Sequence, residues 1–292
     1  MSGHLSAAVS VLIWGTTFIS TKILLEDFVP IEILFFRFVL GYAALWIVSP
    51  KFIKPLGFKK EILFAGAGLC GVTLYFLFEN IALTYSPASN IGVIVSVAPF
   101  FTAICAYFFL KKEKLSPSFF AGFLLAIIGI TLISFNGKFT LELNPLGDLL
   151  GVFAAVAWAF YSILTKKISA FEVPLILMTR RIFFYGLLFI MPVLFFFDFR
   201  FGFERFSNPT NLFNILFLGF GASALCFAVW NRAVRILGAV KTSVYIYMTP
   251  VVTVITSAIV LKEKITPILL VGVVFTLSGL ILSEKKGKKD KG

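Results

Sequence analysis

A few charged side chains occur inside long apolar stretches of this sequence. Glu79 is the one carboxylate well inside such a stretch, in YFLFENIAL, and Arg37 and Arg181 each lie seven residues after a proline that opens a segment. Charges within a membrane span mark ion or substrate pathways, so Glu79 could carry a coupling proton or pair with one of the arginines. The arginines could bind an anionic group. Their duplication favours bridging between helices or snorkelling instead.

Aromatic and hydroxyl side chains accompany these charges. Trp14 and Trp158 fall inside apolar stretches, away from the interfacial belts where tryptophan is usual. A cavity lined by such rings suits an amphipathic metabolite, although with 37 phenylalanines many rings will simply face lipid. Asn80 and Asn231 could contact substrate, but hydrogen bonding between helices is the safer interpretation. The candidate substrate-binding residues are Trp14, Thr17, Tyr75, Glu79, Asn80, Ser96, Trp158, Tyr161, Asn231, Tyr245 and Tyr247.

Two prolines lie at the centres of apolar stretches, Pro99 and Pro250. A proline inside a helix removes one backbone hydrogen bond and clashes with the preceding turn. Breaks at matching depth in two halves point to the binding site of a transporter. We therefore expect hinges here, with a plain structural kink as the alternative.

The composition indicates that these residues lie on helices that span a membrane. The chain is 59% hydrophobic and 14% charged, with a mean hydropathy of +0.99. Apolar runs of about 20 residues are candidate membrane-spanning helices, and the absence of apolar/polar alternation disfavours a barrel. The sequence predicts an all-α membrane protein whose ten transmembrane helices lie near 5–24, 30–49, 62–83, 88–110, 117–135, 147–167, 173–197, 211–233, 239–261 and 267–284.

The sequence repeats itself once. Trp14 and Arg37 recur 144 residues later, Asn80 and Pro99 recur 151 later, and Gly122 recurs 150 later. Five spans per copy force the second copy to enter the membrane from the opposite side, which is the inverted repeat of alternating-access transporters. We expect an N-terminal repeat over 1–140, an inverted C-terminal repeat over 141–284 and a Lys-rich cytoplasmic tail over 285–292. The drift in offset places extra residues in the loop after the seventh segment.

The positive charge follows the expected topology. Of the 26 Lys and Arg residues, 17 fall on the side that holds both termini, six on the opposite side and three within segments. Because basic residues accumulate in cytoplasmic loops, both termini are expected in the cytoplasm, and a nucleic-acid partner is not. Three unpaired cysteines and one histidine predict no disulfide, metal or cofactor. No phosphate-cradling loop is present, which disfavours ATP-driven transport by this chain alone.

The stretch SPASNIGVIVSVAPFFTAICAYFFLKKEKLSPSFFAGFLLAIIGITLI resembles the repeat signature of the drug/metabolite transporter superfamily, in its EamA-type branch. Its elements are a mid-helix proline, a Lys-Glu turn at 112–113 where the family usually has Gly-Glu, a Ser-Pro pair and spaced glycines. A second copy carries Lys-Glu at 262–263. The resemblance implies a bacterial inner-membrane exporter of amino acids or related metabolites, with fifth and tenth helices that pack outside a central cavity.

The sequence therefore predicts a secondary transporter of small amphipathic metabolites that works as a monomer by alternating access. A flippase for a lipid or lipid-linked substrate is the alternative. A membrane-embedded enzyme would need a clustered acid–base or metal set, and the single carboxylate within a span and the terminal histidine do not provide one.

Overall fold

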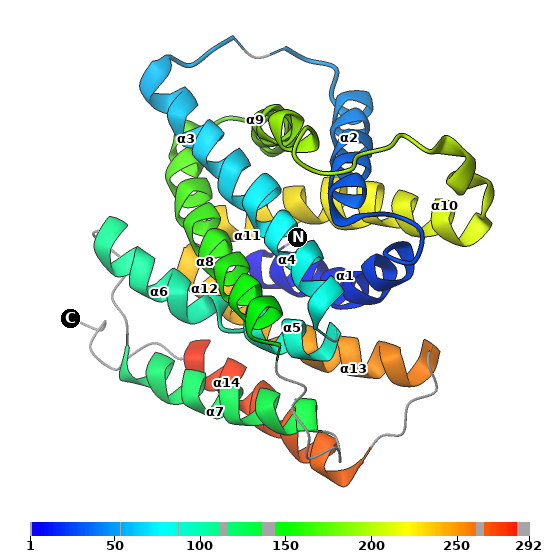
Figure 1. Ribbon diagram of the computed structural model, residues 1–292. Helices are drawn as coiled ribbons and strands as arrows, with labels where there is room; N and C mark the ends of the chain where they lie inside the picture. Colours follow the sequence, from blue (N-terminus) through cyan, green and yellow to red (C-terminus); the bar gives the residue numbers. More distant parts are fainter. Residues whose placement is uncertain are drawn as a thin grey trace.

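The computed structural model describes residues 2–52, 54–86, 88–110, 116–135, 144–260 and 266–284. All regular elements in these ranges are helical. The expected repeat boundary at 140/141, the Lys-Glu turns at 112–113 and 262–263, and the tail 285–292 lie outside the described residues. Figure 1 shows the helices crossing in a layered bundle, with α7 and α14 side by side at the bottom of the view.

The helices before residue 140 follow the apolar runs closely. They are α1 (Gly3–Leu24), α2 (Pro30–Val48), α3 (Phe58–Gly68), the π-helix η1 (Leu69–Leu74), α4 (Tyr75–Tyr85), α5 (Ala88–Val95), α6 (Ala98–Phe109) and α7 (Pro117–Phe135). Prolines occupy the first turn of several helices, where a missing N–H has no intrahelical partner to lose.

A second group of helices follows from residue 145 onward. They are α8 (Pro145–Ile168), the short 3₁₀ turn η2 (Ser169–Phe171), α9 (Leu175–Leu194), η3 (Phe203–Ser207), α10 (Pro209–Leu216), the π-helix η4 (Phe217–Leu225), α11 (Cys226–Leu237), α12 (Ala239–Ser243), η5 (Val244–Tyr247), α13 (Met248–Val260) and α14 (Pro267–Glu284). The side chain of Asn144 caps α8 by accepting from the Gly147 N–H at 3.2 Å.

Seven helical stretches in the described residues are long and apolar enough to cross a membrane: Gly3–Leu24, Pro30–Val48, Phe58–Tyr85, Ile91–Phe109, Pro145–Phe171, Leu175–Leu194 and Pro209–Leu237. Two shorter apolar helices cover Pro117–Leu132 and Leu270–Ser283. The lengths suit a bilayer whose hydrocarbon core is about 30 Å thick.

The helix breaks lie next to the two central prolines. α5 ends at Val95 and α6 begins at Ala98, so Pro99 lies in the first turn of a new helix. The 3₁₀ segment η5 precedes α13, whose first turn contains Pro250. In both places the proline follows the interruption, where its ring has no regular helical turn to clash with.

Glycines permit close helix contacts. A Cβ built on Gly129 would lie 2.4 Å from the backbone nitrogen of Thr276, and one on Gly122 would lie 2.6 Å from the carbonyl oxygen of Gly279. The backbones of α7 and α14 therefore touch, as small residues allow in lipid. Gly68 approaches α9 equally closely, with its Cβ position 2.6 Å from the Gly186 nitrogen.

The connection between α9 and α10 spans 195–208, whereas the equivalent connection between α2 and α3 spans 49–57. The connection after α9 is five residues longer, which covers five of the seven residues by which the sequence offset drifts. This longer connection is anchored to α2, because Arg205 forms an ion pair with the buried Glu32 at 2.8 Å and stacks over Phe28.

Candidate functional site

A small central cavity lies where α1, α4, α5, α8 and the start of α13 converge. Its volume is about 30 Å³, enough for one or two water molecules, since each needs about 10–15 Å³ of such space. A metabolite does not fit into this volume, so binding requires the surrounding helices to separate. The lining consists of Trp14, Thr17, Phe18, Tyr75, Phe76, Glu79, Val95, Trp158, Ile246 and Thr249.

Glu79 provides the only charge among these lining residues. Its side chain is 5% exposed, and its Oε2 atom has no hydrogen-bond partner. A buried polar group without a partner costs free energy until a ligand, water or proton satisfies it. This oxygen is therefore a ready acceptor for a donor that enters the cavity.

The positive charge of Arg37 acts on Glu79, yet the two described side chains form no ion pair. Its Nε donates to Ser223 Oγ at 3.1 Å, and its guanidinium stacks on Phe76, with Cζ 4.1 Å from the ring centroid. Its Nη2 has no hydrogen-bond partner. Arg37 thus bridges α2 to η4 from behind the cavity wall, while Phe76 forms part of that wall.

Aromatic rings form half of the lining residues. Trp14 and Trp158 meet edge to face with centroids 5.1 Å apart, and Tyr75 lies 4.9 Å from Trp158. The Trp14 indole donates to the carbonyl of Ala222 at 2.9 Å, whereas the Trp158 Nε1 has no partner. The wall therefore presents π-faces, which attract cations, and one unused N–H donor.

The structure brings five of the eleven candidate substrate-binding residues into the cavity lining and places six elsewhere. The five are Trp14, Thr17, Tyr75, Glu79 and Trp158. Thr17 donates to its own helix, at the carbonyl of Trp14.

The two repeat-related asparagines connect helices. Asn80 donates to the carbonyl of Pro30 at 3.1 Å, which joins α4 to the start of α2. Asn231 accepts from the Tyr161 hydroxyl at 2.8 Å and donates to Thr179 Oγ1 at 3.0 Å, which joins α8, α11 and α9. In this conformation their hydrogen bonds hold the bundle together.

The remaining candidates lie at the helix break and toward one end of the bundle. Ser96 donates to the carbonyl of Gly92 at 2.6 Å, next to the α5–α6 break. The Tyr245 hydroxyl meets His4 Nδ1 at 2.7 Å, near the start of α1. Tyr247 is fully buried and packs with residues of α7 and α14.

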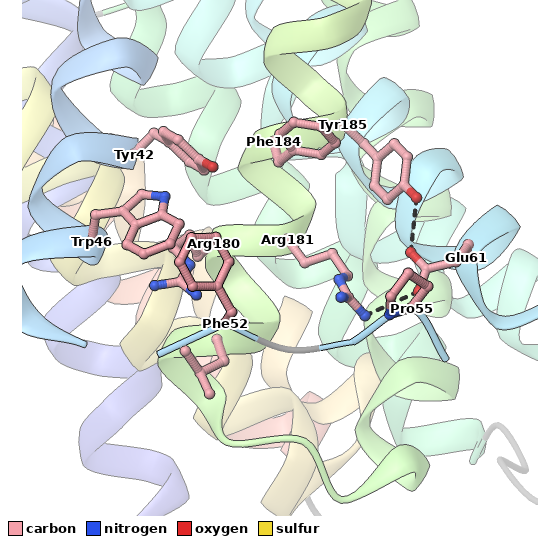
Figure 2. Close-up of a pocket in the computed structure, with 10 residues that line it drawn as sticks. Tyr42, Trp46, Phe52, Pro55, Glu61, Arg180, Arg181, Phe184 and Tyr185 are labelled. Atoms are coloured by element: carbon pink, nitrogen blue, oxygen red, sulfur yellow. Dashed lines mark hydrogen bonds and ion pairs between the residues drawn. The ribbon is translucent and has the colours of Figure 1, made fainter. Parts of the chain in front are cut away.

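Arg181 belongs to a second, larger hollow of about 280 Å³ between α2, α3 and α9, hereafter the lateral groove. Figure 2 shows Arg180 beside Trp46 on one side of the groove and Arg181 directed toward Glu61 on the other. Arg181 forms an ion pair with Glu61 at 3.0 Å, and the Tyr185 hydroxyl donates to the same carboxylate at 2.8 Å. Neighbouring residues on a helix point about 100° apart, which separates the two arginines.

Sequence reasoning missed several lining residues. Phe18, Phe76, Val95, Ile246 and Thr249 line the cavity, but nothing in their type separates them from other apolar or hydroxyl residues. Phe18 lies four residues after Trp14, and Phe76 lies three residues before Glu79. Residues at these spacings share one face of a helix, so helical periodicity could have identified both phenylalanines as lining residues. The described residues contain no group of three or more potential metal ligands.

Curated relatives of this chain are named as transporters. An archaeal protein from Archaeoglobus fulgidus, named an uncharacterized transporter, is 29% identical over 290 residues, which cover 97% of each chain. A Salmonella typhimurium protein, named a probable amino-acid metabolite efflux pump, is 27% identical over 95% of this chain and 93% of its own. A protein of known crystal structure superposes with a TM-score of 0.76 over 97% of this chain and 96% of its own, and at 19% identity this likeness shows the fold alone.

The EamA-like transporter family matches residues 1–135 and 145–284, which is nearly the whole chain. The resemblance to the drug/metabolite transporters is confirmed, and the relatives' names indicate transport rather than enzymatic catalysis. With its long apolar helices, the chain is an integral membrane protein that works in a lipid bilayer. It belongs to the EamA-like transporter family.

Proposed function

We propose that this protein is a secondary transporter in which ten transmembrane helices, arranged as two inverted five-helix repeats, move a small amphipathic metabolite by alternating access. The ten segments are the seven long stretches together with α7, α12–α13 and α14. The halves would correspond to residues 1–140 and 141–284, in line with the two ranges that the family matches.

Reciprocal contacts between repeat-related residues support a two-fold relation. Gly122 approaches Gly279, and Gly129 approaches Gly272, while Gly272 and Gly279 are the repeat counterparts of Gly122 and Gly129. In a two-fold interface, residue i contacts j while the counterpart of j contacts the counterpart of i. The counterparts Trp14 and Trp158 likewise meet each other at the centre.

A pair of lysines supports the same relation. Lys22 at the end of α1 donates to the carbonyl of Leu83 in the last turn of α4 at 2.7 Å. Its counterpart Lys166 at the end of α8 donates to the carbonyl of Arg235 in the last turn of α11 at 3.4 Å. Each lysine places its charge at the negative end of a helix dipole. The π-helices η1 and η4 also occupy corresponding positions.

The substrate we propose carries an amine and an apolar body, as an amino acid or related metabolite does. The single observation that carries this proposal is the unpartnered carboxylate oxygen of Glu79 inside an aromatic cavity. An ammonium group could donate to this oxygen while the faces of Trp158 and Tyr75 attract its charge. The Salmonella relative's name, a probable amino-acid metabolite efflux pump, points to the same class and to export.

The flippase alternative receives less support from the cavity. Its described lining contains a carboxylate and no lysine or arginine. An anionic lipid phosphate would therefore meet like charge without a compensating cation, which is unfavourable in a low-dielectric site. A zwitterionic or cationic amine meets a complementary charge there.

Alternating access requires contacts at the two ends of the bundle to break in turn. At one end His4 of α1 meets Tyr245 of η5, and at the other Ser86 donates to Asp148 of α8 at 3.2 Å. Both contacts join the two proposed halves, so each would have to break for the halves to separate at that end. We propose that the halves rock about the breaks beside Pro99 and Pro250. Glu79 would exchange a proton for substrate during the cycle.

We further propose that the protein functions as a monomer in a bacterial inner membrane with both termini in the cytoplasm. The distribution of lysine and arginine supports this orientation. Two complete halves in one chain support the monomer, because one copy can then enclose the whole cavity.

Uptake of a labelled amino-acid mixture by proteoliposomes, with and without an imposed pH gradient, tests the proposal. Saturable uptake that the gradient accelerates is the expected result. Uptake indifferent to the gradient would remove proton coupling. No uptake of any amino acid by protein shown to be folded would overturn the substrate class.

A further inference from the structure

The lateral groove is a second hollow that the transport proposal does not use. It shares no lining residue with the central cavity. Its polar walls come from Arg180 and Arg181 of α9 and Glu61 of α3, so its lining carries a net charge of one positive unit. Exposed Lys51 and Lys54 lie in the connection that borders it. This charge is opposite to that of the central cavity.

Arg180 is held in position for an anionic ligand. Its Cζ lies 3.8 Å from the centroid of the Trp46 ring, and its Nη1 and Nη2 donate to the carbonyls of Ser49 and Lys51. A guanidinium has five N–H donors in a rigid fork, and these contacts leave several of them available. The side chain is only 6% exposed, so little conformational freedom would be lost on binding.

The opposite wall supplies further polar groups. Arg181 is oriented by Glu61, and the Tyr185 hydroxyl is oriented by the same carboxylate. Figure 2 shows the groove between these groups and Tyr42 with Trp46. A ligand in the groove would lie between two guanidinium groups that diverge from adjacent positions of one helix.

The surroundings of the groove are apolar and exposed. Ile47 is 81% exposed, Phe52 87% and Phe184 48%. Arg180 follows the first residue of α9 by five positions, which is about 8 Å along the helix. The groove therefore lies at the level where lipid headgroups meet acyl chains, and its apolar rim continues toward the bilayer interior.

We propose that the lateral groove binds the headgroup of an anionic phospholipid from the adjoining leaflet, with the phosphate near Arg180 and the acyl chains along Phe184. One phosphodiester charge complements the net charge of the lining. The volume of about 280 Å³ is below that of a pocket for a whole drug-sized ligand. It therefore suits a headgroup whose chains remain in the bilayer. Basic pockets between transmembrane helices recognise anionic headgroups in this way.

Lipid titration of the delipidated full chain in detergent, followed by native mass spectrometry, tests this proposal independently of transport. The probes are dioctanoyl phosphatidylglycerol and dioctanoyl phosphatidylcholine, with glycerol 3-phosphate and inorganic phosphate as soluble competitors. Both lipids carry the phosphodiester, but in phosphatidylcholine the choline ammonium cancels its charge. We therefore expect the net positive lining to bind phosphatidylglycerol about tenfold more tightly than phosphatidylcholine. Equal affinity for the two lipids would overturn the proposal. Displacement of the lipid by either soluble anion at equal concentration would assign the groove to a soluble ligand instead.

Two variants locate the site. Arg180→Gln should lower phosphatidylglycerol affinity about tenfold, the loss expected for one charge-assisted hydrogen bond, with Arg180→Lys retaining part of it. Because Arg180 also tethers the end of α2, Phe184→Glu provides a test at an exposed position. It should abolish selectivity for the anionic lipid, whereas the uncharged Phe184→Gln should preserve it. Unchanged selectivity in both Arg180→Gln and Phe184→Glu would refute the assignment.

Discussion

Replacing Glu79 by glutamine tests the proposed amine site most directly. The substitution keeps the shape of the side chain and removes its charge. Oε2 has no hydrogen-bond partner and the side chain forms no ion pair. Glutamine also keeps an oxygen that can accept from the Tyr75 hydroxyl, which interacts with this side chain, so the folded protein should lose little stability. A charge-assisted hydrogen bond to a ligand contributes about 1.5–3 kcal/mol. Its loss should raise the half-saturation concentration of an amine substrate roughly 10- to 150-fold.

The assay compares two related substrates in proteoliposomes. Uptake of an amino acid should show the full loss, whereas an N-acetylated analogue without the ammonium group should show almost none. Stimulation by a pH gradient should also disappear, since glutamine carries no exchangeable charge. Glu26→Gln, which removes the same charge from an exposed position, is the matched control and should leave both kinetics and coupling unchanged.

Three results would contradict these expectations. Equal losses for the amino acid and its N-acetylated analogue would show that Glu79 acts on the structure and not on the ammonium group. Full retention of pH-gradient stimulation in Glu79→Gln would remove the proton-coupling role. A large drop in melting temperature would contradict the expectation that glutamine preserves the contacts of this side chain within the protein.

Three further substitutions probe the bundle. Tyr245→Phe removes the 2.7 Å contact with His4. Because a neutral hydrogen bond contributes about 1 kcal/mol, amide hydrogen exchange in the first turns of α1 should become about fivefold faster. Unchanged exchange would exclude a role of this contact in holding the two proposed halves together. Asn231→Ala leaves the Tyr161 hydroxyl without its acceptor and should destabilise the protein to chemical unfolding by about 1–2 kcal/mol. The loss of unfolding free energy should be smaller in a Tyr161→Phe background. Equal losses in both backgrounds would refute an energetic coupling between Asn231 and Tyr161. Gly129→Leu should lower the melting temperature by several degrees because overpacking costs about 1–3 kcal/mol, and an unaltered temperature would contradict the close contact of α7 with α14.

The helical segments follow from the sequence because lipid leaves the backbone few alternatives. Each apolar run must satisfy its own hydrogen bonds, and the observed helices begin and end within a few residues of the expected spans. Pro30 and Pro117 open helices for a local reason, since their missing N–H groups have no partner in the first turn. The composition likewise identifies a membrane protein without any tertiary information.

The lining of the cavity could be predicted only in part. Glu79 and Trp158 stand out because their types are rare at such depth, and both line the cavity. Asn231 is as unusual in type, yet its side chain binds Tyr161 and Thr179 and holds three helices together. Residue type identifies a polar group inside a span, but whether it faces a cavity or a neighbouring helix depends on helix rotation.

The two arginines that follow the prolines show most clearly which properties the sequence sets and which the tertiary structure sets. By itself the sequence determined that Arg37 and Arg181 lie about two turns inside repeated segments, because local spacing sets depth along a helix. Only the tertiary structure decided their surroundings: Arg37 is buried on Phe76 behind the central cavity, and Arg181 faces Glu61 in the lateral groove. Depth is a property of one helix, whereas a binding site is made by several helices whose rotation and contacts arise from packing distant segments.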